Sequence, residues 1–435
     1  MKYFQPELET MSAADRRALQ SERLVSTVKY VYERQKPYRE KMDAIKLRPS
    51  DIKGIEDIWK LPYTQKSDLR NSYPFGMMAA TRKELVRLHA SSATTGKLTV
   101  SGYTKHDIDV WADCAARSLV MAGADEESIV HVCYGYGLFT GGLGMHYGAE
   151  KLGAIAVPAS AGNTQRQLQL LADFGADIIC CTPSYAIYLI EEMEKAGLKP
   201  GRDLKLKGGC FGAEAWTEEM RAEIERRLGI RACDIYGLSE ISGPGVANDC
   251  EYKTGMHFQD DHYFPEIVDT ETLEPLPMGE RGELVITTLD RTGMPLIRYR
   301  TRDIAALDDT PCPCGRTTIR MKRITGRSDD MLIIRGVNVF PSQIESILLK
   351  DPYVQPHYHI NVDRVNNLDT LEIVVELSPD AMSDTMSEIE AIRSRLSAEM
   401  ASGISVTAKI TLVSPGTIER SEGKSKRITD RRKIK

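Results

Sequence analysis

The chain lacks any long apolar run. In its 435 residues, no stretch approaches the roughly 18 consecutive apolar residues that a membrane-spanning helix needs. The first residues, MKYFQPELETMSAADRR, are polar and acidic, and they lack the apolar segment of a secretory leader. With 42% apolar and 27% charged residues, the composition is that of a folded protein, long enough for two or more domains. We therefore expect a cytoplasmic protein with no membrane partner.

The sequence also lacks a Walker A motif. That motif requires a glycine five residues before its Gly-Lys pair and a Ser or Thr directly after it, whereas Ser91 and Leu98 occupy these positions. The chain has instead the stretch Ser91–Lys97, Ser-Ser-Ala-Thr-Thr-Gly-Lys, in which hydroxyls, a glycine and a lysine can surround phosphate oxygens. This pattern favours a nucleotide enzyme outside the P-loop class. A polar surface loop between a strand and a helix is the alternative.

The nine cysteines do not follow the spacing of a disulfide framework. Free thiols in a reducing compartment are the ordinary interpretation. However, Cys250, His257, Cys312 and Cys314 offer three thiolates and an imidazole, a set that suits tetrahedral zinc. Cys-Pro-Cys-Gly in a strand hairpin slightly favours a zinc site over free thiols. Such a site would be structural, because the protein would fill all four positions.

Positive charge is concentrated at the C-terminal end. Residues 420–435 contain eight Lys or Arg and two acids, although the whole chain carries a net charge of −5. No aromatic residue is interleaved with these charges, which argues against a nucleic-acid partner. A basic segment that meets a polyphosphate fits the charge pattern better.

The middle of the chain alternates between short apolar segments and amphipathic ones. The segments expected to form strands are 129–134, 154–158, 177–181 and 205–211, and those expected to form helices are 107–121, 165–172, 186–196 and 218–228. This alternation predicts an α/β fold with parallel strands covered by helices. In such sheets the active site lies at the carboxyl ends of the strands.

The pattern changes after about residue 260. Residues 280–289 indicate an antiparallel strand, residues 341–349 and 386–400 two helices, and residues 371–377 and 405–413 two strands. We therefore predict a large N-terminal domain, residues 1–327, with mostly parallel sheets and a β-rich part. A small, mobile α+β domain, residues 328–435, should follow.

Seven segments resemble, in their order, the motifs of the adenylate-forming ligases, which include acyl-CoA synthetases and luciferase-like enzymes. They are Ser91–Lys97, Tyr134–Tyr147, Gly212–Trp216, Tyr236–Glu240, Tyr299–Asp303, Gly326–Glu345 and Gly423-Lys424. The second segment and the Arg335–Glu345 stretch are similar to the phenylacetate–CoA ligase subgroup. Ala93, Leu98 and Ala215 depart from the usual pattern, in which a glycine and two prolines stand at these positions.

The resemblance implies a reaction in two steps. ATP and an aryl carboxylic acid, with phenylacetate the first expectation, would form an acyl-adenylate and pyrophosphate. The thiol of coenzyme A would then displace AMP and give a thioester. An adenylyltransferase of the deazaflavin-adenylating type, which stops at AMP transfer, is the alternative. A homodimer is expected from the subgroup.

The resemblance also implies roles for individual residues. Glu240 would bind Mg²⁺, Asp303 would accept both ribose hydroxyls, and Lys424 would contact the reacting groups during adenylation. Phosphate and nucleotide contacts would come from Ser91, Ser92, Thr94, Thr95, Gly96, Lys97, Ala213, Glu214, Asp234, Ile235, Tyr236, Gly237, Ser239 and Arg327.

Three further groups of residues follow from the resemblance. Asp329 would be the hinge about which the C-terminal domain rotates between the two steps. The thiol tunnel would be lined by Gly336, Val337 and Asn338, and the acyl pocket by Tyr136, Phe139, Gly142 and Gly212. His146 is expected to have a packing role.

Overall fold

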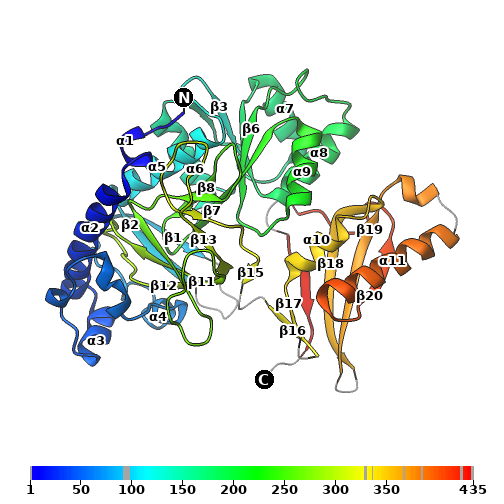
Figure 1. Cartoon of the computed structure of the whole chain (residues 1–435). Coiled ribbons are helices and arrows are strands. Elements are labelled where there is room, and N and C mark those ends of the chain that lie inside the picture. Colours follow the sequence, from blue (N-terminus) through cyan, green and yellow to red (C-terminus); the bar gives the residue numbers. More distant parts are fainter. Residues whose placement is uncertain are drawn as a thin grey trace.

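The computed structural model of the chain describes residues 2–91, 98–327, 331–335, 337–365, 368–383, 386–421 and 425–432. Figure 1 shows a large N-terminal part, coloured blue to yellow, and a smaller C-terminal part, coloured yellow to red, at its side. None of the helices within these residues is long and apolar enough to cross a membrane.

The largest sheet within the described residues has nine strands in the order β13-β14-β9-β8-β7-β6-β5-β3-β4. Strands β7, β6, β5, β3 and β4 are parallel neighbours, and the other strands pair antiparallel. The bounds are β3 (Ile129–Val132), β4 (Ile155–Val157), β5 (Ile178–Cys181), β6 (Gly208–Gly212), β7 (Arg231–Leu238), β8 (Gly243–Asp249), β9 (Met256–Phe258), β13 (Leu307–Asp308) and β14 (Arg320–Met321). The predicted parallel strands are confirmed.

Helices cover this sheet. They are α5 (Lys105–Met121), α6 (Gly141–Leu152), α7 (Thr164–Phe174), α8 (Pro183–Lys195) and α9 (Glu218–Leu228). Hydroxyl side chains fix where the helices begin, since Thr182 caps α8 and Thr217 caps α9 by accepting a backbone N–H. The apolar faces of α7, α8 and α9 share one buried core with β5 and β6, as the amphipathic pattern predicts.

A second, antiparallel sheet has the order β10-β11-β12-β15 and forms the predicted β-rich part. Its strands are β10 (Tyr263–Val268), β11 (Gly282–Thr288), β12 (Tyr299–Ala305) and β15 (Gly326–Arg327), and a separate antiparallel pair consists of β1 (Leu85–Ser91) and β2 (Thr99–Thr104). The segment Ser91–Lys97 therefore joins two strands and not a strand and a helix. The N-terminal elements are α1 (Pro6–Glu9), α2 (Ala13–Arg34), α3 (Lys36–Ala44), η1 (Pro49–Asp51), η2 (Ile55–Lys60) and α4 (Lys66–Asn71).

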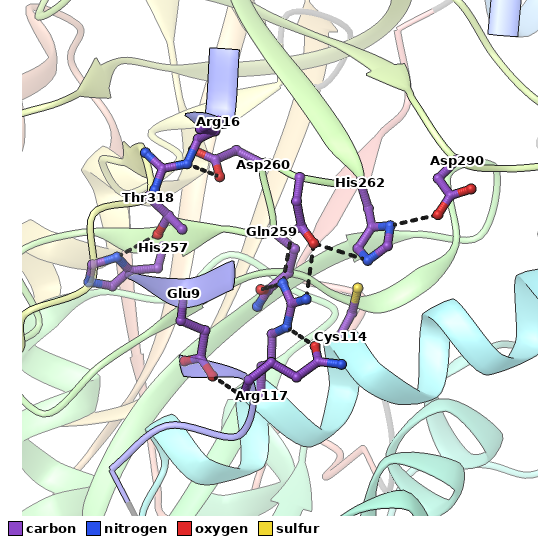
Figure 2. Close-up of polar contacts among 12 residues, drawn as sticks. Glu9, Arg16, Cys114, Arg117, His257, Gln259, Asp260, His262, Asp290 and Thr318 are labelled. Atoms are coloured by element: carbon purple, nitrogen blue, oxygen red, sulfur yellow. Dashed lines mark hydrogen bonds and ion pairs between the residues drawn. The ribbon is translucent and has the colours of Figure 1, made fainter. Parts of the chain in front are cut away.

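Buried ion pairs attach the N-terminal helices to the rest of the large part (Figure 2). Arg117 of α5 forms two hydrogen bonds to Asp261, at 2.8 and 3.0 Å, and donates a third to the side chain of Gln5 at 2.6 Å. Arg16 of α2 lies 3.1 Å from Asp260. These contacts join residues more than a hundred positions apart, so the N-terminal segment is part of the folded unit.

The C-terminal part has a core of its own. It contains β16 (Leu332–Ile334), β17 (Val337–Val339), α10 (Pro341–Leu348), β18 (Val354–Val365), β19 (Leu368–Leu377), η3 (Asp380–Ser383), α11 (Met386–Ile404), β20 (Lys409–Val413) and β21 (Ile428–Asp430). The sheet order is β20-β19-β18-β21, an α+β arrangement as predicted. The expected strand 405–413 begins only at Lys409. The division at residues 327 and 328 stays a prediction.

Candidate active site

Glu240 follows β7 and faces the end of β1. The Ser91 hydroxyl donates to its Oε1 at 3.0 Å, and Lys66 Nζ of α4 lies 3.3 Å from the same oxygen. The carboxylate is buried, with 6% of its side chain exposed. The fold therefore brings the residue expected to bind Mg²⁺ to the entrance of the expected phosphate loop.

A cavity of about 220 Å³ opens beside Glu240. Its lining contains one acid, Glu240, and five cations, which are Lys66, Arg70, Arg300, Arg302 and Arg327. Arg300 is paired with Glu283 at 2.6 Å, and Arg327 with Asp303 at 3.0 Å. Arg302 also lies 3.6 Å from Glu283. Against the carboxylates of Glu240, Glu283 and Asp303, the five cations leave an excess of two positive charges, which suits a polyphosphate with a divalent cation.

Asp303 lies on β12 between two donors. The Tyr236 hydroxyl donates to its Oδ2 at 2.6 Å, and Arg327 Nη1 donates to its Oδ1 at 3.0 Å. Burial raises the pKa of Tyr236 well above its usual value, and the nearby Asp303 charge adds to this rise. The phenol therefore stays protonated and donates to Asp303. This hydrogen bond joins Tyr236, which is expected to contact the nucleotide, to the carboxylate expected to bind the ribose.

The ends of β6 and β7 approach each other closely. A Cβ added at Gly212 would lie 2.2 Å from the Ile235 carbonyl oxygen, so only glycine fits there. Ala213, which follows, has a positive φ of 72°. Burial raises the pKa of Asp234 to about 6. The pairing of Gly212 with Ile235 brings Ala213 next to the end of β7, which carries Ile235 and Tyr236, two other residues assigned to the nucleotide.

Glu214 has both of its carboxylate oxygens engaged. Its Oε1 accepts the Ser184 N–H at 2.7 Å, and its Oε2 accepts the Ser425 N–H at 3.1 Å. Ser425 belongs to the C-terminal part and directly follows Lys424. Glu214 therefore connects the large part with the segment that carries the expected catalytic lysine.

The segment expected to line the acyl pocket lies beside Ser239. Thr140 Oγ1 is 3.3 Å from Ser239 Oγ, and a Cβ at Gly237 would lie 1.8 Å from the Gly243 carbonyl oxygen. Gly142 has the same restriction, since its Cβ would come within 2.9 Å of the Tyr136 ring. Phe139 is 58% exposed, so its ring is free to meet a ligand.

His146 contacts Tyr136 and Glu150. Its Nδ1 lies 3.4 Å from the Tyr136 hydroxyl, and its Nε2 lies 3.1 Å from Glu150 Oε1. The histidine contacts a residue expected in the pocket, and its expected packing role stays a prediction.

The four candidate zinc ligands converge. The ligand atoms of Cys250, His257, Cys312 and Cys314 all lie within 4.8 Å of one another, and all four residues are buried. Cys250 Sγ is 3.7 Å from Cys312 Sγ, and Cys314 Sγ is 3.4 Å from His257 Nε2. With bonds of about 2.3 Å to sulfur and 2.0–2.1 Å to nitrogen, a tetrahedral site has edges of about 3.8 Å and 3.5 Å. The observed spacing fits zinc.

Hydrogen bonds orient two members of this cluster. Thr318 Oγ1 lies 2.9 Å from His257 Nδ1, which leaves Nε2 directed at the three sulfurs. The Arg316 N–H donates to Cys314 Sγ at 3.4 Å. The hydrogen bond from the Cys250 thiol lowers the pKa of Cys314, and His257 adds to this effect although burial opposes it.

Several predicted site residues lie outside the described residues. They are Ser92, Thr94, Thr95, Gly96, Lys97, Asp329, Gly336 and Lys424, together with the side chain of Asn338. Val337 lies on β17 and pairs with Ile334.

The sequence interpretation missed Lys66, Arg70 and Arg302, which line the cavity beside Glu240. No motif surrounds Lys66 or Arg70, so only their three-dimensional position reveals them.

Two family models match the chain. The model of AMP-binding enzymes matches residues 102–289, and that of the AMP-binding enzyme C-terminal domain matches residues 336–432. The chain is 50% identical to the phenylacetate-coenzyme A ligase of Thermus thermophilus, over 99% of this chain and 100% of that protein. It is 49% identical to the enzyme of that name from Escherichia coli, over 98% and 97% of the two chains.

The chain belongs to the phenylacetate–CoA ligase family. It is thus an enzyme, a ligase of the AMP-binding type, and the resemblance found in its motifs is confirmed.

Solved structures agree with this assignment. The ligase superposes on 2-hydroxyisobutyryl-CoA ligase in the postadenylation state with a TM-score of 0.93, at 30% identity over 99% of this chain and 93% of the other. For the same protein in the thioesterification state, with an acyl-AMP and CoA, the TM-score is 0.74 at 31% identity, over 99% and 92% of the chains.

Proposed function

We propose that this enzyme converts phenylacetate to its CoA thioester through a phenylacetyl-adenylate, with release of AMP and pyrophosphate. Its membership of the family makes it an ATP-dependent acid–CoA ligase that works through an adenylate. The observation that carries the proposal is the arrangement of Asp303, Tyr236 and Arg327 beside the cationic cavity at Glu240. These groups would bind the ribose and the polyphosphate side by side, as ATP requires.

The first step joins a carboxylate to a polyanion, so negative charge must be neutralised. A carboxylate oxygen of the acid attacks the α-phosphorus of ATP, and the bond to pyrophosphate breaks. Lys66, Arg70 and Arg302 would stabilise the charge that develops on the phosphates, because all three line the cavity beside Glu240. In the second step the thiol of coenzyme A attacks the acyl carbon and AMP leaves.

We further propose Mg²⁺ as a cofactor, held by Glu240. The carboxylate is buried and lies beside the cations that line the phosphate cavity, and one protein carboxylate suffices for a metal that takes its other ligands from phosphate and water. The metal would supply charge neutralisation on the phosphates. Ser91, which hydrogen-bonds to Glu240, would keep the carboxylate oriented.

We propose structural zinc at Cys250, His257, Cys312 and Cys314. The edge lengths of the cluster support it, and the protein supplies all four ligands, so no water position is left for catalysis. The site would join the segment after β8 to the hairpin before β14. Elemental analysis of protein purified without chelator should give one equivalent of zinc.

The roles assigned from sequence to residues outside the described structure belong to the same proposal. Lys424 would contact the carboxylate and α-phosphate during adenylation, and the C-terminal domain would rotate about Asp329 before thioester formation. Gly336, Val337 and Asn338 would then line the thiol path. A relative solved in states named postadenylation and thioesterification supports a rotation of this kind.

A panel of aryl acids tests the proposed substrate. Pyrophosphate release is measured for phenylacetate, indoleacetate, benzoate and a short aliphatic acid, each with and without coenzyme A. Phenylacetate should give the highest kcat/KM, and mass spectrometry should find phenylacetyl-CoA only when coenzyme A is present. A stable adenylated product with coenzyme A present would favour the adenylyltransferase. Light scattering tests the expected homodimer, and fractionation the expected cytoplasmic location.

A further inference from the structure

We infer that Glu191, on α8, is a positioning residue that holds the C-terminal part in the orientation needed for adenylation. Figure 1 shows α8 and α9 at the side of the large part that faces α10 and β18. Glu191 belongs to none of the segments that resemble the family motifs. The inference rests on the proposed two-step reaction.

Both carboxylate oxygens of Glu191 bind side chains of the C-terminal part. Its Oε1 is 2.6 Å from His357 Nε2 of β18, and its Oε2 is 3.1 Å from Arg420 Nε. All three side chains are largely buried, with 14%, 11% and 17% of their surface exposed. A half-exposed surface pair would contribute little, whereas a shielded carboxylate with two partners can bias the orientation of a domain.

Arg420 is held in place by a contact within the C-terminal part, independently of Glu191. Its two terminal nitrogens each donate to Glu376 at 2.8 Å, and the Glu376 side chain is fully buried. The Nε–H donates to Glu191. Because Glu376 already holds the guanidinium, little side-chain entropy is lost when the contact to Glu191 forms.

The position of Arg420 in the chain connects this contact to the chemistry. Lys424 follows four residues later, and Ser425 then donates its N–H to Glu214 of the large part. Two carboxylates of the large part, Glu191 and Glu214, therefore hold the chain on either side of the lysine assigned to adenylation. A rotation that removes the C-terminal part from the first site must break both contacts to Glu191.

The carboxylate of Glu191 stays charged in this setting. Burial raises its pKa, but the hydrogen bond from His357 and the charges of His357 and Arg420 outweigh burial and lower it overall. Replacement by glutamine keeps the size of the side chain and removes the charge. The substitution therefore tests the electrostatic contact and not the packing of α8.

The experiment compares the two half-reactions in Glu191→Gln and in wild type. With phenylacetate and ATP, we expect acyl-adenylate formation to slow by roughly 30-fold or more, the lower end of the loss expected when a shielded charge pair between surfaces loses one partner. Thioester formation from supplied phenylacetyl-adenylate and coenzyme A should be unchanged or faster, because the rotated orientation is no longer disfavoured.

Glu194→Gln is the matched control. Glu194 lies on the same helix, but its partner at 2.6 Å, Arg227, belongs to the large part and not to the C-terminal part. This variant should keep both half-reactions at wild-type rates. His357→Leu should shift the half-reactions in the same direction as Glu191→Gln, by a smaller factor. The double variant should form acyl-adenylate little more slowly than Glu191→Gln alone, because both substitutions remove the same contact between Glu191 and His357.

Three outcomes would overturn the inference and leave the proposed function standing. They are equal losses of rate in both half-reactions of Glu191→Gln, wild-type rates in both half-reactions, or a slower adenylation with unchanged thioester formation in Glu194→Gln. Melting temperatures separate a folding defect from a change in orientation, since a merely structural role lowers both activities together. A wild type that forms no acyl-adenylate with any acid would instead overturn the proposed function, and the inference with it.

Discussion

Replacement of Cys312 by serine tests the zinc site most directly. Cys312 is 7% exposed, and its sulfur lies 3.7 Å from that of Cys250. Serine has nearly the same shape, but its hydroxyl is a poor zinc ligand at neutral pH. We expect the variant to retain less than about a tenth of an equivalent of zinc, whereas wild type holds one.

The loss of stability can be estimated from mass action. A metal that binds only the folded state stabilises it by about 2.7 kcal/mol when its free concentration is a hundred times Kd. Changes in the second shell alone weaken metal sites by roughly 10- to 100-fold, so loss of a thiolate should remove nearly all of this stabilisation. An unfolding entropy of roughly 2.1 cal/mol/K per residue gives about 0.9 kcal/mol/K for 435 residues, so we expect Tm to fall by roughly 3 °C.

The assay compares Tm with and without a chelator. Chelator should lower the Tm of wild type towards that of Cys312→Ser, and it should leave the variant unchanged. Cys233→Ser is the control, since Cys233 on β7 is fully buried and lies outside the cluster. It should lose about 1–3 kcal/mol from burial of a hydroxyl, keep its zinc and still respond to chelator. The zinc site would be refuted if purified wild-type protein contained no zinc and its Tm did not change on addition of chelator.

Three other predictions follow from the same structure and sequence. Lys424→Ala should slow adenylation severely and leave thioester formation from supplied acyl-adenylate largely intact; equal loss in both steps, measured separately, would remove the assigned role. Asp329→Pro should restrict φ and slow thioester formation more than adenylation, and wild-type rates in both would place the hinge elsewhere. Arg117→Met should cost about 1.5–3 kcal/mol in urea unfolding at pH 7, since it removes two hydrogen bonds to the buried carboxylate of Asp261 and leaves that carboxylate with His262. Burial raises the pKa of Asp261, but the charges of His262 and Arg117 outweigh it and hold the pKa well below its usual value. Its stabilisation is thus complete above the unfolded pKa of about 3.9 and is lost as pH falls towards the folded value. The cost of Arg117→Met should shrink in acid, and a cost independent of pH would contradict this.

The alternating part of the fold could be read from sequence because each element buries a regular face. Residues 129–134 and 218–228 were expected as a strand and a helix, and they form β3 and α9. The strand expected from residue 405 failed at its start, because α11 continues to Ile404 and Ser405 then adopts a positive φ of 55°. Periodicity identifies an element, but the residue at which it begins depends on local backbone geometry.

The candidate site was predictable only where it follows a motif. Glu240, Asp303 and Tyr236 occupy ordered segments, and the cluster that contains Cys312 and Cys314 has a ligand spacing that can be recognised. Lys66 could not be found in this way. It reaches Glu240 from a helix far away in the sequence, and no local pattern distinguishes it from the other lysines of the chain.

The attachment of the N-terminal segment has a consequence for synthesis of the chain. Tyr3 donates its hydroxyl to the Cys314 carbonyl, Glu9 pairs with Arg316, and Arg16 donates to the Thr317 carbonyl. The partners of the first residues are therefore made about three hundred residues later. At translation rates of roughly 5–20 residues per second, the first helices wait about 15–60 s on the ribosome before their binding surface exists. Until then, α2 can pack only on the neighbouring residues 38–61, which share its apolar core in the folded chain.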